Sequence, residues 1–284
     1  MNPERLVIFD YSGTLSREAV LFARPETLMN YLKESGLFDL GIDSLDFFWR
    51  EIVNATWEEG STTGIGYARL IEQRLRELSP PRGPHASLAD SATAASRFVD
   101  SYFTHSPPDR RWQPLLTNLV SYPRTCVVVA TDHYAEATEY ITNFLEDLAI
   151  PAKPVRELIT KSACDIAVVA NSADIGHPKA DRRFWEILKS NLELKTIRRV
   201  LFVDDFGHNE GEGDDYGNIT RVEVRKEKTG AILTEVFPGE ITALPFLIKR
   251  DDSETPTYDR DEQAYGALIE TTIKYVENWL TKAP

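Results

Sequence analysis

The sequence predicts an α/β fold in which a doubly wound parallel sheet is covered by helices and a smaller, all-helical unit is inserted into the chain. Short apolar runs rich in β-branched residues alternate with helical patterns over much of the sequence, which is typical of a parallel sheet wrapped by helices. The stretch from residue 10 to residue 126 has no strand pattern, and a segment of that length is not expected to be a loop. It is therefore expected to form a helical module.

Four apolar runs are the predicted strands, at residues 6–9, 127–130, 166–170 and 200–203. Each is bounded by polar or turn-forming residues, and an uninterrupted apolar run is expected of a strand buried on both faces. Helices are expected at 135–148 and 180–192, after the second and third runs, and an amphipathic helix at 263–280.

The segment between the first two runs predicts further helices, at 25–33, 44–56, 63–78, 87–102 and 112–120. Their apolar residues recur at helical spacing, which we interpret as core packing. The stripe of the second helix, which Ser44 is expected to cap, consists of Leu45, Phe48, Trp49, Ile52 and Thr56. We predict a core domain of residues 1–16 and 112–284 and an inserted helical cap domain of residues 17–111.

Charge and composition argue against several classes of partner. The chain has 284 residues, 42% of them hydrophobic, and its 32 basic and 45 acidic residues leave a net charge of −13. This excess of carboxylate repels nucleic-acid backbones and anionic membrane surfaces, so neither is an expected partner. The apolar runs are too short to span a membrane and the first strand leaves no room for a signal peptide, so we expect a cytoplasmic protein. Cys126 and Cys164 lack a metal-type or redox-type spacing and are expected to be buried.

Polar residues at the ends of the predicted strands are the candidate functional residues. Asp10 follows the first run and Thr131 the second, Lys179 closes the loop after the third, and Asp204 and Asp205 end the fourth. Because reactive groups gather at the carboxyl ends of parallel strands, these side chains are expected to meet. A buried carboxylate at such a place needs a cation as its partner.

Taken in order, these segments resemble the motifs of the haloacid dehalogenase superfamily. Its first motif, Asp-x-Asp-Gly-Thr, corresponds to Asp10-Tyr11-Ser12-Gly13-Thr14. Its other motifs are a strand that ends in Thr or Ser, a lysine, and a strand that ends in paired acids. The resemblance covers the predicted sheet domain and implies a Rossmann-like core with a mobile cap between the first two motifs.

The resemblance also implies a role for each matching residue. Asp10 is the implied nucleophile, which becomes an aspartyl phosphate. The other implied catalytic residues are Ser12, Thr131 and Lys179, and the substrate-binding candidates are Thr14, Thr131, Asp132 and Lys179. The implied Mg²⁺ ligands are Asp10, the backbone carbonyl of Ser12, Asp204, Asp205 and Asn209. Physical reasoning agrees, because Mg²⁺ and a lysine neutralise the charge that keeps a carboxylate away from a phosphoryl group.

Each candidate also has a purely structural explanation. The paired acids can open a turn, Thr131 or Asp132 can cap the following helix, and Lys161 is a rival to Lys179. Three histidines near the predicted strand ends can shuttle protons but are more often surface residues: His133, His177 and His208.

Ser12 departs from the family pattern, because the second aspartate of the first motif stands at this position. That aspartate normally protonates the leaving group and then activates water, which a serine hydroxyl cannot do near neutral pH. Three explanations stay open. Another residue, such as His133 or a cap residue, takes over the proton transfers; or the leaving group needs no proton; or the fold is kept only for binding.

Members of the superfamily that lack this aspartate help to choose between these reactions. Phosphonatases carry alanine there but need a cap lysine, and this chain has no lysine between Lys33 and Lys153. Haloacid dehalogenases proper carry tyrosine there and lack the paired metal acids. We therefore predict a Mg²⁺-dependent phosphoryl-transfer hydrolase, a phosphatase acting on a small phosphorylated metabolite. The alternatives are a catalytically weak binding or regulatory protein and a phosphonatase-like C–P hydrolase.

Overall fold

The structure, a computed structural model, describes residues 2–78, 88–158, 165–209, 219–248 and 258–282. Its centre is a six-stranded sheet with strand order β3-β4-β2-β1-β5-β6, in which each pair of neighbours is parallel. The strands are β1 (Arg5–Phe9), β2 (Thr125–Thr131), β3 (Ala152–Pro154), β4 (Ala167–Asn171), β5 (Arg199–Asp204) and β6 (Glu240–Pro245). The predicted α/β fold class with a parallel sheet is confirmed.

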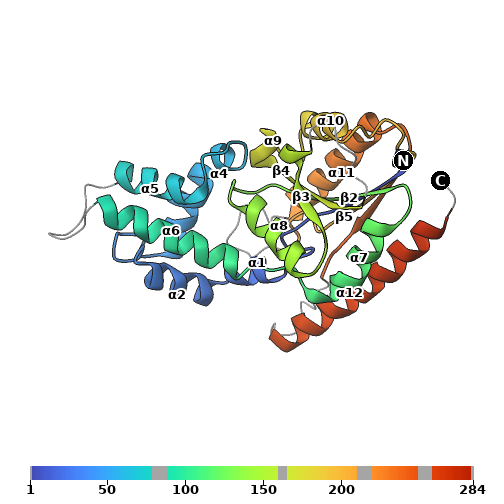
Figure 1. Cartoon of the computed structure of the whole chain (residues 1–284). Coiled ribbons are helices and arrows are strands. Elements are labelled where there is room, and N and C mark those ends of the chain that lie inside the picture. Colours follow the sequence, from blue (N-terminus) through green and yellow to red (C-terminus); the bar gives the residue numbers. More distant parts are fainter. Residues whose placement is uncertain (1, 79–87, 159–164, 210–218, 249–257, 283–284) are drawn as a thin grey trace.

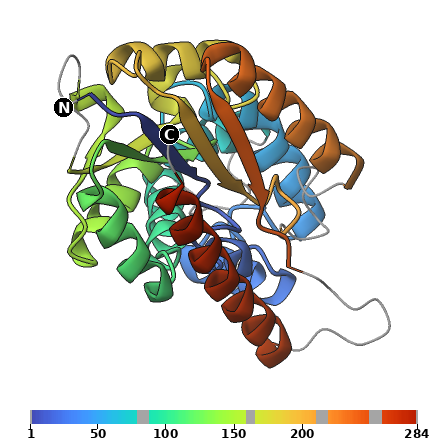
Figure 2. The same ribbon diagram turned by 90° about the vertical axis from the view of Figure 1, so that its right-hand side faces the viewer.

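Helices cover both faces of this sheet (Figure 2). One face packs against α7 (Gln113–Ser121), α8 (Ala137–Asp147) and α12 (Tyr258–Thr281), and the other against α10 (Arg182–Asn191) and α11 (Ile219–Val236). In β1, Val7 and Phe9 belong to the first core, and Leu6 and Ile8 to the second. All four side chains are fully buried, which explains why the central strand is an unbroken apolar run.

The residues between β1 and β2 form helices that pack on one another beside the sheet, at the left of Figure 1. They are α1 (Glu18–Phe22), α2 (Pro25–Ser35), α3 (Leu45–Phe47), a π-helix (Phe48–Val53), α4 (Asn54–Gly60), α5 (Tyr67–Leu78) and α6 (Leu88–Thr104). A 3₁₀ turn at Arg110–Trp112 leads back towards the sheet. The two connections to the sheet lie side by side, because the backbone amide of Asp109 donates to the carbonyl of Leu15 at 2.8 Å.

Helix α12 contacts both of these connections. Arg17 and Arg111, one from each connection, both form ion pairs with Glu262. The guanidinium groups of the same two arginines lie over the ring of Tyr265. The hydroxyl of Tyr265 donates to the carbonyl of Thr14 at 2.8 Å. The C-terminal helix therefore ties together the two places where the chain passes between the sheet and the inserted helices.

Two expected helices differ from the structure. The helix expected at 44–56 begins as predicted, since the Ser44 hydroxyl accepts from the amide of Phe47 at 3.3 Å, but it contains a π-helical segment between α3 and α4. The helix expected from residue 63 begins at Tyr67. Gly66 has φ +89°, which interrupts a right-handed helix, and the Glu136 carboxylate accepts from the amide of Tyr67 at 2.8 Å.

Several elements have no counterpart among the predictions. Strands β3 and β6 form the two edges of the sheet, and β6 is partly exposed along its length, so it lacks the apolar run of a central strand. Helix α11 is highly charged and contains Gly230. The short helices α1 and α9 (Ser172–Ile175) and a 3₁₀ turn at Val155–Glu157 complete the described elements.

No helix in the described ranges is both long and apolar enough to cross a membrane. Cys126 is buried in β2, as predicted. Cys164 and Lys161 lie outside the described residues.

Candidate active site

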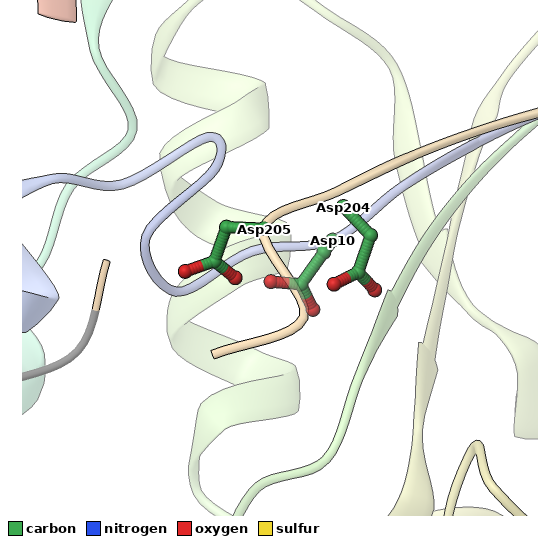
Figure 3. A group of neighbouring side chains, drawn as sticks. All are labelled: Asp10, Asp204 and Asp205. Atoms are coloured by element: carbon green, nitrogen blue, oxygen red, sulfur yellow. The ribbon is translucent and has the colours of Figure 1, made fainter. Parts of the chain in front are cut away.

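Three carboxylates meet at the carboxyl end of the sheet. Asp10 follows β1 and Asp204 ends β5, and these strands are neighbours in the sheet, which brings the two residues together. With Asp205 they form a cluster in which one oxygen of each side chain lies within 4.8 Å of the others (Figure 3). All three residues are buried. The sheet topology thus assembles the acids that the sequence placed at separate strand ends.

Lys179 is the cation of this cluster. Its Nζ forms ion pairs with Asp10 Oδ1 and, at 2.9 Å, with Asp204 Oδ2. Its backbone is held on both sides: the amide donates to Asp132 Oδ1 at 2.8 Å, and the carbonyl accepts from the indole of Trp185 at 2.7 Å. These bonds place the lysine at the carboxylates although it comes from the loop before α10.

A strained turn orients Asp205. Phe206, directly after it, has φ +55°, a left-handed conformation that costs a non-glycine residue about 1–2 kcal/mol. The turn lets the two oxygens of Asp205 accept from the backbone amides of Gly207 at 3.1 Å and Asn209 at 2.8 Å. Backbone strain retained beside a cluster of acids is typical of functional sites.

Gly13 makes room for the same carboxylate. Its φ is +72°, and a Cβ atom at this position would lie 2.5 Å from Asp205 Oδ2. Any residue with a side chain would have to displace Asp205, which explains physically why glycine stands at this position of the first motif.

The cluster carries more negative than positive charge. Three carboxylates and one lysine leave two net negative charges when all four groups are ionised, in a region with almost no contact with water. Burial, the largest effect, and the two neighbouring acids raise the pKa of Asp10 well above its ordinary value, although Lys179 lowers it. Burial also raises the pKa of Asp132, the next carboxylate along the site. An additional cation would relieve this imbalance.

The carboxylates form one end of a cavity of about 340 Å³. Asp10, Ser12, Thr131, Asp132 and Lys179 all line it, so the structure brings these predicted residues to one surface. Asp204 and Asp205 line it as well. The volume lies at the lower end of the range for small-molecule sites, so the cavity fits one small molecule.

Two predicted site residues, Thr14 and Asn209, lie next to the cavity wall and form hydrogen bonds within the loops of the site. Thr14 was expected to bind substrate, but it is fully buried and its hydroxyl accepts from the amide of Asp205 at 3.1 Å. Asn209 was expected to bind Mg²⁺, but its Nδ2 donates to the carbonyls of Gly13 at 2.8 Å and Phe246 at 2.9 Å, and its Oδ1 accepts from Ile248 at 3.0 Å. Neither lines the cavity. In this structure both side chains hold the loops of the site in place, and their predicted roles toward substrate and Mg²⁺ stay predictions.

His133 lines the cavity in a neutral form. Its Nδ1 accepts from the amide of Tyr134 at 2.8 Å, so the proton of the neutral ring is on Nε2, which lies 2.8 Å from the Tyr102 hydroxyl. Burial lowers the pKa of His133 to about 4. A ring in this state is not suited to replace the missing acid–base aspartate near neutral pH. His177 and His208 do not line the cavity.

The far end of the cavity was missed by sequence reasoning. Its walls are the side chains of Phe22, Phe48, Trp49, Trp57, Phe98 and Tyr102, all from the inserted helices. Phe48 and Trp49 belonged to a predicted apolar stripe that we interpreted as core packing; Phe48 lies in the core and Trp49 packs against it, and both line the cavity as well. The number of aromatic residues in that segment was the available signal.

Comparisons with known proteins show a likeness to a solved structure. Neither a protein-family model nor the sequence of a curated protein matches the chain. Among solved structures, the chain is similar to a 2-haloacid dehalogenase from Pseudomonas syringae pv. tomato DC3000, at 16% sequence identity and a TM-score of 0.46. The match covers 77% of this chain and 84% of the dehalogenase.

Proposed function

We propose that this protein is a Mg²⁺-dependent phosphoryl-transfer hydrolase, a phosphatase that acts on a small phosphorylated molecule through an aspartyl phosphate on Asp10. The observation that carries the proposal is the buried cluster of three carboxylates around one lysine, which closes one end of a small-molecule cavity. In this proposal residues 17–111 are a cap domain that covers the reaction site.

The donor set fits a magnesium ion. Asp10, Asp204 and Asp205 offer the oxygen ligands that Mg²⁺ prefers, and the two net negative charges of the cluster call for a cation. The carbonyl of Ser12 is a further candidate ligand in the proposal. When bound, the ion supplies charge neutralisation at the phosphoryl oxygens.

The protein residues have distinct roles in the proposed reaction. An Asp10 oxygen attacks phosphorus, and Lys179, already bonded to Asp10 and Asp204, orients that carboxylate and offsets the charge of the incoming phosphoryl group. In the proposal, the Thr131 hydroxyl donates to a phosphoryl oxygen, which is supported by its position at the end of β2 and on the cavity wall. Asp132 holds Lys179 through its backbone amide.

A binding or regulatory protein is the second candidate, favoured by Ser12. This residue lines the cavity beside Asp10, where a phosphatase of this type normally has its acid–base carboxylate. General acid–base catalysis contributes roughly 10²–10⁴-fold to such reactions, so a chain without it can bind a phosphate ester and turn it over slowly.

Thermal unfolding with beryllium trifluoride and Mg²⁺ tests the proposal, because this anion mimics a phosphoryl group bound to a carboxylate. We expect a rise in Tm for the protein and none for Asp10→Asn. The control is Asp174→Asn, another buried aspartate whose partners are Thr138 and Arg156, outside the cavity. Release of inorganic phosphate from a panel of esters then separates the two candidates. A rise in Tm without turnover supports the binding protein, and turnover that survives Asp10→Asn contradicts the aspartyl phosphate.

A further inference from the structure

We propose that the far end of the cavity binds an uncharged aromatic group, so that the substrate class is aryl phosphomonoesters. This inference rests on the proposed function. We call this part of the cavity the aromatic chamber, defined by Phe22, Phe48, Trp49, Trp57, Phe98 and Tyr102.

The charged and the apolar residues that line the cavity come from different parts of the fold. Among the described residues that line it, the charged ones all come from the sheet and its flanking elements: Asp10, Asp132, Lys179, Asp204, Asp205 and Arg225. The residues contributed by the inserted helices are aliphatic or aromatic, apart from Asn54. A sugar phosphate or a bisphosphate would bury hydroxyl or anionic groups against these walls, which is costly without matching partners. An aromatic ring has no polar group that would be left without a hydrogen-bond partner there, and it packs against the other rings.

The π-helix shapes this chamber. A π-helix bonds residue i to residue i+5, so residues five apart lie on the same side. Two such pairs line the cavity, Phe48 with Val53 and Trp49 with Asn54. Ile52 and Phe48, which share the predicted α-helical stripe, both belong to the buried core, and Phe48 lines the cavity as well. The irregular segment therefore turns Trp49 and Val53 towards the ligand space, in keeping with the frequent occurrence of π-bulges at functional sites.

The aromatic walls are held in place by contacts between them and the sheet domain. The ring of Tyr102 stacks on His133, with centroids 5.5 Å apart, and their polar atoms are hydrogen bonded at 2.8 Å. Trp57 meets the ring of Tyr134 edge to face at 5.4 Å, and the Tyr134 hydroxyl is bonded to Thr56 at 3.2 Å. These polar atoms serve the frame of the chamber and leave ring surface for the ligand.

An aryl ester also offsets one of the two losses at Ser12, the protonation of the leaving group, while the activation of water stays slow. A phenol, with a pKa of about 10, leaves as its anion far more readily than an alkyl alcohol, so proton donation to the leaving group matters less. In the first step an Asp10 oxygen bonds to phosphorus while the bond from phosphorus to the aryl oxygen breaks, and its electron pair stays on the phenolate. Water then attacks phosphorus, the bond to Asp10 breaks, and the proton of that water goes to the phenolate. A phenol and hydrogen phosphate are released.

The test compares 1-naphthyl phosphate with glycerol 1-phosphate as substrates and measures the binding of 1-naphthol by calorimetry. We expect kcat/KM for the naphthyl ester to exceed that for the glycerol ester by at least about a hundredfold. We also expect 1-naphthol to bind, because its binding does not depend on the reactivity of an ester. Trp49→Ala should weaken 1-naphthol binding roughly tenfold and lower kcat/KM for the naphthyl ester by a similar factor, and Trp49→Phe should restore most of both.

Two further variants keep the test decisive. Tyr275→Ala, which removes an exposed aromatic side chain on α12 outside the cavity, should change neither quantity. Val53→Lys places a charge in the chamber and should weaken 1-naphthol binding even if Trp49→Ala does not fold. Asp10-dependent turnover of glycerol phosphate at a rate equal to that of the naphthyl ester, with no binding of 1-naphthol, overturns this inference and leaves the proposed function standing. Binding of 1-naphthol that depends on Trp49, without turnover of any ester, supports the aromatic chamber and refutes the phosphatase.

Discussion

Replacing Lys179 by methionine is expected to destabilise the protein strongly when no metal is present. The lysine is the cation bonded to both Asp10 and Asp204, and its side chain is only 8% exposed. Methionine keeps most of the length and volume of the side chain and removes the charge. The three buried carboxylates would then hold three negative charges in place of two.

The size of the effect follows from the burial of both partners. The side chains of Asp10 and Asp204 are 9% and 4% exposed, so water cannot compensate them when the lysine is lost. Removing one partner of a buried ion pair costs about 3–5 kcal/mol, and we expect a loss of that size in the free energy of unfolding. Adding Asp10→Asn to this variant should recover part of the loss, because the cluster returns to two negative charges.

Urea unfolding in EDTA and in saturating Mg²⁺ measures this effect. The loss should be largest in EDTA and smaller with Mg²⁺, which supplies positive charge to the same acids. The exposed Lys195→Met serves as the control and should change the free energy of unfolding by less than about 0.5 kcal/mol. If Lys179→Met is no less stable than this control in EDTA, Lys179 does not stabilise the protein by neutralising the buried carboxylates.

Three other predictions follow from the site. Asp205→Asn should weaken Mg²⁺ binding in calorimetry more than Asp204→Asn, because Asp204 is already paired with Lys179; equal effects would contradict this ranking. Ser12→Asp should raise steady-state phosphate release about a hundredfold and remove an initial burst that rapid quench detects in the parent protein, since it restores an acid–base carboxylate; a parent protein without a burst would show that another group transfers the protons. His133 has a folded-state pKa of about 4 against 6.5 in the unfolded chain, so between these values the unfolded state binds more protons and stability falls as the pH falls. From pH 7 to pH 4 this costs about 3 kcal/mol, and urea unfolding of His133→Gln should show a correspondingly smaller loss; the same loss in both proteins would refute the neutral, buried ring.

The polar residues at the strand ends of the site could be predicted because the sequence pattern that marks them is local. The apolar run of β1 is followed by Asp10, and those of β2 and β5 end in Thr131 and Asp204; parallel pairing alone then brings these three residues to one edge. The same reasoning fails at the edges of the sheet. β6 is half exposed and shows no such run, so its contribution to the fold could not be predicted.

The hydrogen bonds of Thr14 and Asn209 could not be predicted, because their partners lie far away in the sequence. The Thr14 hydroxyl bonds to a backbone amide 191 residues later, and the Asn209 amide to a carbonyl 196 residues earlier. Both residues match motif positions, but only the folded loops show which of their atoms are already used. Spacing identifies the residue type and not its hydrogen-bond partners.

The aromatic chamber escaped prediction for a different reason. Apolar residues at helical spacing give the same pattern whether they pack in a core or line a cavity. In the structure Ile52 is core and Trp49 lines the cavity, and the difference comes from a π-helical register that no residue type in the segment specifies.

The contact of α12 with both connections has a consequence for the biosynthesis of the chain. Arg17 and its partner Glu262 are 245 positions apart, so at roughly 5–20 residues per second the arginine leaves the ribosome about 10–50 s before the glutamate exists. During that interval the inserted helices can fold from contacts close in sequence, while the strands of the sheet are still being added one by one. Glu262 and Tyr265 add their contacts with the two connections only when the final helix arrives. A nascent chain interrupted before α12 would thus rely on the contacts of Tyr102 with His133 and of Tyr67 with Glu136 to hold the inserted helices on the sheet, and it would lack those at the two connections.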